Sequence, residues 1–127
     1  MLQTGKNTKK LNNVLIEYKN VNINQMSQQV LRNVTLNIDK GEFIYITGKV
    51  GSGKSSFIKT LYGELAIEEG EAYVMEYDML KIKPKHIPQL RRKIGIIFQD
   101  FQLLTDRCVE DNLRFVLKAT GWTDKNE

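Results

Sequence analysis

Residues 48–56 carry the sequence pattern with the clearest chemical meaning in this chain. They read GKVGSGKSS and match the spacing G-x-x-x-x-G-K-[ST] at Gly48, Gly53, Lys54 and Ser55, with one more glycine inside the loop. Glycines allow consecutive backbone N–H groups to point into one concavity without a Cβ in the way, which makes a nest for anions. The motif therefore predicts a loop that holds the phosphates of a nucleotide.

The polar side chains of this loop suit a nucleoside triphosphate. Lys54 is placed to reach the β- and γ-phosphates as a point charge, and the Ser55 hydroxyl is a suitable ligand for Mg²⁺, which prefers oxygen. A helix beginning at Lys54 would add unpaired N–H groups and the positive end of its dipole. The alternative, a glycine-rich turn without a ligand, is disfavoured because motif and flanking elements agree.

The residues around the loop predict the elements that would position it. Residues 43–47, FIYIT, and residues 94–98, IGIIF, are nearly all apolar, as in strands buried on both faces. Phe57, Ile58, Leu61 and Leu65 recur at helical spacing, which predicts an amphipathic helix over residues 54–65.

The rest of the chain alternates between strand and helix patterns. Further predicted elements are strands over 14–23 and 30–38 joined as an antiparallel unit, turns at 39–42 and at Gly70, a strand over 71–77, a short helix between Pro84 and Arg92, and a helix from Val109 to near Gly121. This alternation favours an α/β fold with parallel strands. Residues 1–12 are predicted to be a flexible polar leader.

Composition limits the class of protein. The chain has 127 residues, 41% of them hydrophobic and 27% charged, which favours one soluble globular domain. No apolar run approaches the roughly 18 residues of a membrane span, and no signal peptide is recognised. The single cysteine, Cys108, cannot form an internal disulfide, which favours a reducing compartment such as the cytoplasm.

The net charge is +4, and the densest basic segment is KIKPKHIPQLRRK over residues 81–93. It could bind nucleic acid or anionic lipid. A solvated surface is the favoured interpretation, because no aromatic residues alternate with the charges, and no nucleic-acid partner is expected. His86 lies in this segment without a second histidine or cysteine at metal-site spacing, so it is interpreted as a surface residue.

Three stretches together resemble the nucleotide-binding domain of ABC transporters: GKVGSGKSS, LRNVTLNIDKGEFIYITG and LRRKIGIIFQDFQLLTDRCVEDNL. The resemblance covers residues 14–122, and residues 90–113 are most similar to the FtsE-like branch of cell-division ATPases. It implies a P-loop NTPase (RecA-like) fold with a parallel core and an antiparallel β subdomain. Residues 13–127 would form the N-terminal portion of such a domain, truncated before its helical subdomain.

The resemblance also implies roles for individual residues. The Walker A loop would bind ATP through Gly48, Lys49, Val50, Gly51, Ser52, Gly53, Lys54, Ser55 and Ser56, with Ser56 on the α-phosphate. Gln99 matches the Q-loop glutamine, which contacts Mg²⁺ and the attacking water. Lys54 and Gln99 would thus be catalytic, and Ser55 and Gln99 would be the Mg²⁺ ligands.

The implied partners are a membrane protein and a second copy of the ATPase. Residues 100–107 would lie where such domains meet an integral membrane protein, here an FtsX-like one. The intact protein would be a homodimer at the inner face of the cell membrane. The sequence leaves open an ATPase of a lipoprotein or macrolide export-like branch, a small P-loop nucleotide kinase or GTPase, and a binding module that does not hydrolyse ATP.

The sequence departs from the family pattern at two positions. Residues 22–29 contain no aromatic that could stack on adenine; Tyr18 is expected to pack in its strand, and Met26 would be a poor substitute. Cys108 stands where relatives commonly place threonine, at the start of the last helix, which we expect to cost that helix about 1 kcal/mol.

Several family motifs do not occur among these residues, namely the LSGGQ-type signature, the Walker B carboxylates and the switch histidine. We therefore expect ATP hydrolysis from the intact protein and little from this chain alone. We also expect the strands at 43–47 and 94–98 to present unpaired apolar edges, which would make the chain unstable as a free monomer.

Overall fold

The computed structural model describes residues 13–122. The chain divides into two compact units, Met1–Pro84 and Lys85–Glu127, which are described separately. The predicted leader over residues 1–12 lies outside the described residues. No helix within 13–122 is both long enough and apolar enough to cross a membrane.

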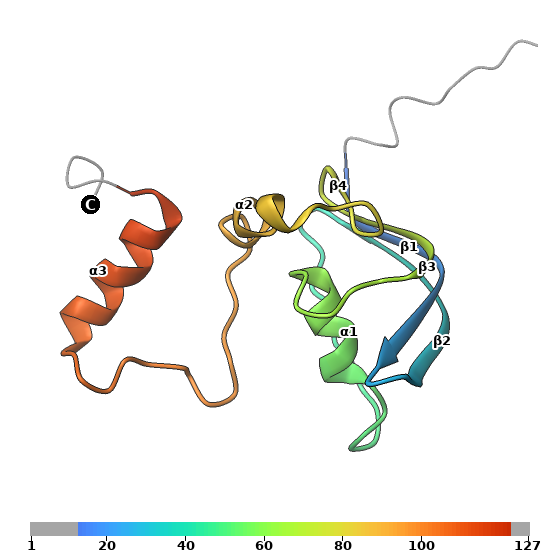
Figure 1. Ribbon diagram of the computed structural model, residues 1–127, viewed down its shortest axis with the longest axis horizontal. Helices are drawn as coiled ribbons and strands as arrows, with labels where there is room; N and C mark the ends of the chain where they lie inside the picture. Colours follow the sequence, from blue (N-terminus) through green and yellow to red (C-terminus); the bar gives the residue numbers. More distant parts are fainter. Residues whose placement is uncertain (1–12, 123–127) are drawn as a thin grey trace, which may run out of the picture. The chain divides into compact units, whose positions relative to one another are not determined.

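The first unit is built on a four-stranded sheet (Figure 1). Its strands are β1 (Val14–Gln25), β2 (Gln28–Asp39), β3 (Glu69–Val74) and β4 (Tyr77–Asp78), in the order β2-β1-β3-β4. All three pairings are antiparallel, and β1 with β2 confirms the predicted antiparallel unit. Their hairpin turns through Met26 and Ser27, whose φ angles of 49° and 63° suit the right-handed twist of the strands.

Helix α1 (Lys54–Leu61) packs on β1 through a small core. The Tyr18 ring, fully buried, meets the Phe57 ring edge to face at 5.6 Å between centroids. The Tyr18 hydroxyl lies 2.9 Å from Thr60 Oγ1, and Thr60 donates in turn to the Phe57 carbonyl at 2.6 Å. The prediction that Tyr18 packs in its strand is confirmed.

Helix α1 is shorter than predicted, and its buried residues match the prediction only in part: Phe57 is buried as predicted. It ends at Leu61 instead of Leu65, because Tyr62 leaves the helical conformation and Gly63 adopts a φ of 69°. Ile58 is 41% exposed, whereas Ser56 is buried. A short helix against a twisted sheet buries one narrow stripe, which here includes Ser56 and Thr60 beside Phe57, and these two polar residues carry no apolar signal in the sequence.

Gly70 lies inside β3, not in the predicted turn. Between Lys19↔Glu71 and Asn22↔Glu69, strand β1 has two residues where β3 has only Gly70, which defines a β-bulge. A Cβ on Gly70 would lie 2.6 Å from the Asn20 carbonyl oxygen and 2.7 Å from the Val21 Cα. The glycine is therefore required by close approach of the two backbones.

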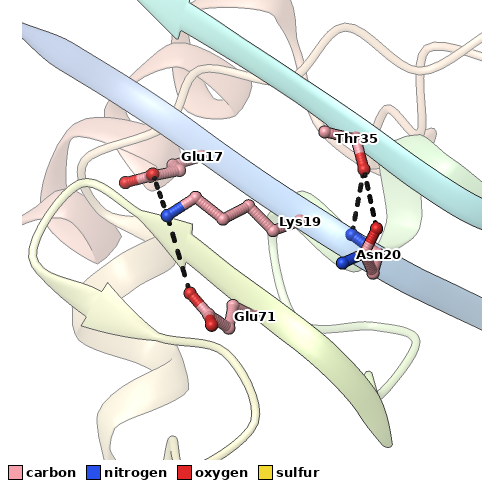
Figure 2. A network of polar contacts seen from close by, with 5 residues as sticks. All are labelled: Glu17, Lys19, Asn20, Thr35 and Glu71. Atoms are coloured by element: carbon pink, nitrogen blue, oxygen red, sulfur yellow. Dashed lines mark hydrogen bonds and ion pairs between the residues drawn. The ribbon is translucent and has the colours of Figure 1, made fainter.

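Polar side chains on both neighbouring strands support the region of this bulge (Figure 2). Asn20, one of the two bulged residues of β1, has a left-handed φ of 52°, and its N–H donates to Thr35 Oγ1 at 3.0 Å. Lys19 lies between two carboxylates, 2.8 Å from Glu17 and 3.6 Å from Glu71. The hydrogen bond to Glu17 is the main reason that the pKa of Lys19 is raised.

The predicted strands at 43–47 and 94–98 are wrong for the described structure. Neither segment joins a β-ladder. Phe43 is 79%, Tyr45 81% and Ile97 91% accessible, whereas the other large apolar residues of 94–98 are half-buried. A strand with two apolar faces needs a paired strand on each edge and cover on each face. Between residues 13 and 122 nothing supplies those neighbours, so both segments stay extended and unpaired.

The described residues of the second unit include two α-helices, and the turn η1 (Pro84–His86) precedes them. Helix α2 (Ile87–Arg91) confirms the short helix, and α3 (Val109–Thr120) confirms the last one. Gly121 ends α3 with a φ of 94°. The apolar residues that predicted α3 are largely exposed, as the accessible fractions of Val109 (78%) and Leu113 (62%) show.

Cys108 is the residue before the first turn of α3, as predicted, and it makes no side-chain bond to a backbone N–H there. Its Sγ donates instead to Asp111 Oδ2 at 3.3 Å. The helix therefore lacks the cap that a threonine or serine would give it.

The buried hydroxyl of Tyr18 predicts a loss of stability in alkali. Burial raises the pKa of Tyr18 from 10.0 to about 12, while the bond to Thr60 acts in the opposite direction. Because the folded state favours the neutral phenol, the Tyr18 contribution to the free energy of unfolding is complete below pH 10. It falls by roughly 2–3 kcal/mol as the pH rises from 10 to 12. Urea unfolding across this range should show that loss in the parent chain and not in Tyr18→Phe. Parallel pH curves for the two proteins would contradict it.

The bulge predicts unequal costs for two glycine substitutions. Gly41 and Gly70 have similar φ angles, 82° and 95°, but a Cβ on Gly41 would meet nothing within 4 Å. Gly41→Ala should therefore cost only backbone strain, about 1 kcal/mol. Gly70→Ala should lower the free energy of unfolding by about 2–4 kcal/mol, because the strands must separate as well. Equal losses for the two variants in urea unfolding would contradict the assigned bulge.

Candidate functional site

The glycine loop lies between the extended segment and α1, and Lys54 closes it. The Lys54 ammonium donates to two loop carbonyls, those of Gly48 at 2.8 Å and Lys49 at 2.7 Å, and lies 3.5 Å from Ser52 Oγ. A cation is thereby held over the loop at the position where the motif predicts phosphate oxygens. Carbonyl oxygens hold this ammonium less strongly than phosphate would, since bonds between two charged groups are the stronger ones.

Gly53 of the loop is required by space, and Gly48 lies close to a side chain of the loop itself. Gly53 is buried with a φ of 91°, and a Cβ there would lie 2.8 Å from side-chain carbons of both Val30 and Leu31 on β2. A Cβ on Gly48 would lie 2.6 Å from Ser52 Oγ. The loop is thus fixed against the β1–β2 hairpin at one end and folded tightly on itself at the other.

The first turn of α1 presents backbone donors without acceptors. The first intrahelical bond runs from the Phe57 N–H to the Gly53 carbonyl at 2.9 Å. The N–H groups of Lys54, Ser55 and Ser56 precede it, and no acceptor within residues 13–122 is bonded to them. Together with the positive end of the helix dipole they form a site suited to an anion.

The two serines after Lys54 differ in environment. Ser55 is exposed, so its hydroxyl is available to a ligand. Ser56 is only 6% exposed, and its hydroxyl donates to Gln25 Oε1 at 2.8 Å. The sequence did not point to Gln25, because a glutamine at the end of a hairpin strand carries no motif; only the fold brings it to the loop.

A shallow hollow of about 560 Å³ lies beside the hairpin but is not lined by the glycine loop. Its lining includes Glu68, which accepts from Asn24 at 3.2 Å, and Glu69, which accepts from Asn22 at 2.6 Å. Carboxylates repel phosphate, so this hollow does not suit a triphosphate. The loop, with its amides and ammonium, is the better candidate.

No aromatic ring from the hairpin is available to stack on a base. Tyr18 is fully buried in the core, as described above. Met26 at the hairpin turn is 94% exposed and is the apolar side chain that projects from this end of the sheet.

Gln99 belongs to the second unit, in an exposed turn directly after residues 94–98. The next two residues, Phe101 and Gln102, have left-handed φ angles of 56° and 46°. The structure brings residues 48–56 together in the first unit, whereas the role of Gln99 stays a prediction from the sequence.

Asn112 organises the segment that precedes α3. Its Oδ1 accepts from the Leu104 N–H at 2.8 Å, and its Nδ2 donates to the carbonyls of Leu104 at 3.0 Å, Arg107 at 3.3 Å and Cys108 at 2.9 Å. One carboxamide thus contacts four backbone groups of residues 104–108, with its two Nδ2 protons shared among three carbonyls. This segment overlaps residues 100–107, for which the sequence predicts contact with a membrane partner, and Asn112 was not singled out by sequence reasoning.

Comparison with known proteins identifies the family. Residues 31–127 match the ABC transporter family. Two solved structures share the fold: the ATP-binding subunit of an ABC transporter, with a TM-score of 0.75 and 27% identity over 87% of this chain and 45% of that one; and a dimeric ATP-binding cassette in a post-hydrolysis state bound to ADP and Pi, with a TM-score of 0.72 and 31% identity over 83% of this chain and 47% of that one. The chain belongs to the ABC transporter family.

Within this family the chain is similar to cell division ATP-binding proteins FtsE. It is 41% identical over 96 residues to that of Streptococcus pneumoniae, 42% over 93 residues to that of Bacillus subtilis and 36% over 111 residues to that of Mycobacterium tuberculosis. These matches cover 76%, 73% and 87% of this chain but only 42%, 41% and 46% of the relatives. The chain thus spans less than half the length of the curated relatives it matches.

The contacts of Asn112 predict that two chemically different substitutions both destabilise the segment. Asn112→Ala should release residues 104–108 and destabilise this segment by about 2 kcal/mol, since several hydrogen bonds are lost together. Asn112→Asp keeps an acceptor for the Leu104 N–H but turns a carboxylate toward backbone carbonyls. The segment should therefore be no more stable in Asn112→Asp than in Asn112→Ala. Amide hydrogen exchange at Leu104 measures both effects. Parent-like protection in Asn112→Asp would show that the amide donors do not hold the segment.

Proposed function

We propose that this chain is the ATP-binding portion of an FtsE-like ABC ATPase. The observation that carries the proposal is the first turn of α1, where N–H groups without acceptors follow a loop that the Lys54 ammonium closes. The family match and the FtsE relatives support ATP as the nucleotide. On this proposal the intact protein hydrolyses ATP and converts the energy into a change in a membrane complex.

Different residues of the loop bind different parts of the triphosphate. Lys54 leaves the carbonyls of Gly48 and Lys49 and bonds the β- and γ-phosphates, exchanging two neutral acceptors for charged ones. The amides over residues 51–56 hold the same phosphates from the other side, assisted by Lys49, Val50 and Ser52 as members of the loop. The positive end of α1 favours this charge.

The Mg²⁺ ion fits the same loop through Ser55. Its hydroxyl is exposed next to Lys54, as a hard oxygen ligand should be. When bound, the ion neutralises charge on the phosphates during transfer. Gln99 is proposed to orient the ion and the attacking water by its carboxamide, which offers both an acceptor and donors.

The proposed partners follow from the relatives. An FtsX-like membrane protein would contact residues 100–107, a range that overlaps residues 104–108, which Asn112 supports. A second copy of the ATPase would complete the nucleotide site, because one solved relative is a dimeric cassette bound to ADP and Pi. The protein would then act at the inner face of the cell membrane.

The test is the affinity of the full chain for Mg·ATP after removal of one positive charge. Lys54→Ala should weaken binding about 10–100-fold in calorimetry, because a charge-assisted bond contributes about 1.5–3 kcal/mol. Lys40→Ala, at an exposed turn remote in sequence from the loop, removes the same charge and should bind within about twofold of the parent. Equal affinities for the Lys54 variant and the parent would refute the proposed phosphate site.

A further inference from the structure

The β1–β2 hairpin reaches the loop through one side-chain hydrogen bond. Gln25 is the last residue of β1 and pairs with Gln28 across the turn, so its backbone is fixed by the sheet. Its Oε1 accepts from the Ser56 hydroxyl at 2.8 Å, and Ser56 is 6% exposed. We propose that Gln25 is a positioning residue for the nucleotide: it controls whether the Ser56 proton is available to the α-phosphate. This inference rests on the proposed function.

The number of protons on the Ser56 hydroxyl limits what this side chain can bond. A hydroxyl has one proton to donate and two lone pairs that accept. Phosphate oxygens only accept at neutral pH, so Ser56 can bond to phosphate only by donating that proton. In the structure the proton is directed to Gln25 Oε1. Gln25 and a phosphate therefore compete for the same donor.

A carboxamide can resolve this competition without leaving its place. Its Nε2 and Oε1 lie at the same end of the side chain, so a half-turn about the last torsion presents a donor where the acceptor was. Gln25 Nε2 then donates to Ser56 Oγ, and the Ser56 proton turns to the phosphate. No proton is transferred and no charge is buried, and the bond between the hairpin and α1 is kept in both states.

The surrounding structure makes the hairpin a rigid support for this exchange. Gly53, three residues before Ser56, packs against Val30 and Leu31 of β2, so the same hairpin fixes both the start of α1 and the partner of Ser56. Ser56 is also followed by Phe57, whose ring is held by Tyr18. The helix cannot move away from Gln25 without opening this core, so adjustment falls to the side-chain amide.

The test uses two substitutions that separate acceptance from donation. Gln25→Glu keeps an acceptor for Ser56 but has no donor, so it should hold the Ser56 proton away from the nucleotide. Gln25→Met has a similar length and neither group, so it should leave the proton free. The thermal midpoint without nucleotide should be parent-like in Gln25→Glu and lowered in Gln25→Met.

Binding is measured with Mg·ATP and with the two diastereomers of its α-thio analogue, in which sulfur, a weaker acceptor, replaces one α-oxygen. The parent should bind ATP several-fold more tightly than one diastereomer. Gln25→Met should keep this preference. Gln25→Glu should lose it, as should Ser56→Ala, and should bind ATP about tenfold more weakly. General repulsion by the new carboxylate weakens all three nucleotides and leaves the preference intact, so the preference isolates the Ser56 proton.

Each outcome decides the inference. An undiminished preference between the diastereomers in Gln25→Glu overturns it. So does weaker ATP binding by Gln25→Met than by Gln25→Glu, because affinity would then follow the thermal midpoint and the bond to Ser56 would be purely structural. A parent chain without a preference between the diastereomers also overturns it, while its binding of Mg·ATP leaves the proposed function standing. A parent chain that does not bind Mg·ATP refutes both.

Discussion

The unpaired N–H groups at the start of α1 are the constraint on which the site depends. A helix leaves its first amides without intrahelical acceptors, and these are usually satisfied by caps or water. Here Gly53 precedes the helix in a left-handed conformation and offers no capping side chain. Its lack of a Cβ lets the chain approach β2, and the amides of residues 54–56 have no acceptor among the described residues. The Lys54 ammonium is hydrogen-bonded to the carbonyls of Gly48 and Lys49 in the same loop. The glycine that is needed for packing is thus also the one that leaves the donors free.

The hairpin is the second determinant, because it supports the loop from the side. Tyr18 and Thr60 join β1 to the end of α1, while Gln25 and Ser56 join it to the beginning. These two hydroxyl contacts fix the direction of the helix along the strand. The bulge at Gly70 allows β3 to follow β1 past an irregular position, so the sheet stays continuous under the helix. The phosphate site is therefore a property of the whole first unit.

The sequence predicted those parts that depend on local pattern. The loop, the β1–β2 hairpin and the limits of α3 follow from glycine spacing, β-branched alternation and the stop at Gly121. Local pattern could not predict whether residues 43–47 and 94–98 form strands. An apolar run forms a buried strand only beside neighbouring strands, and the run itself does not show whether these are present. Gln25 and Asn112 were missed because their roles arise from contacts over 31 and up to 8 positions of sequence separation, which no motif records.

The central claim is that backbone amides of residues 51–56 hold the phosphates of ATP. Amide chemical shifts of the ¹⁵N-labelled chain, titrated with Mg·ATP and separately with adenosine, test it most directly. The account predicts large shifts at these residues with Mg·ATP and none with adenosine, which has no phosphate. Binding of Mg·ATP that shifts other amides and leaves those of residues 51–56 unchanged would contradict it.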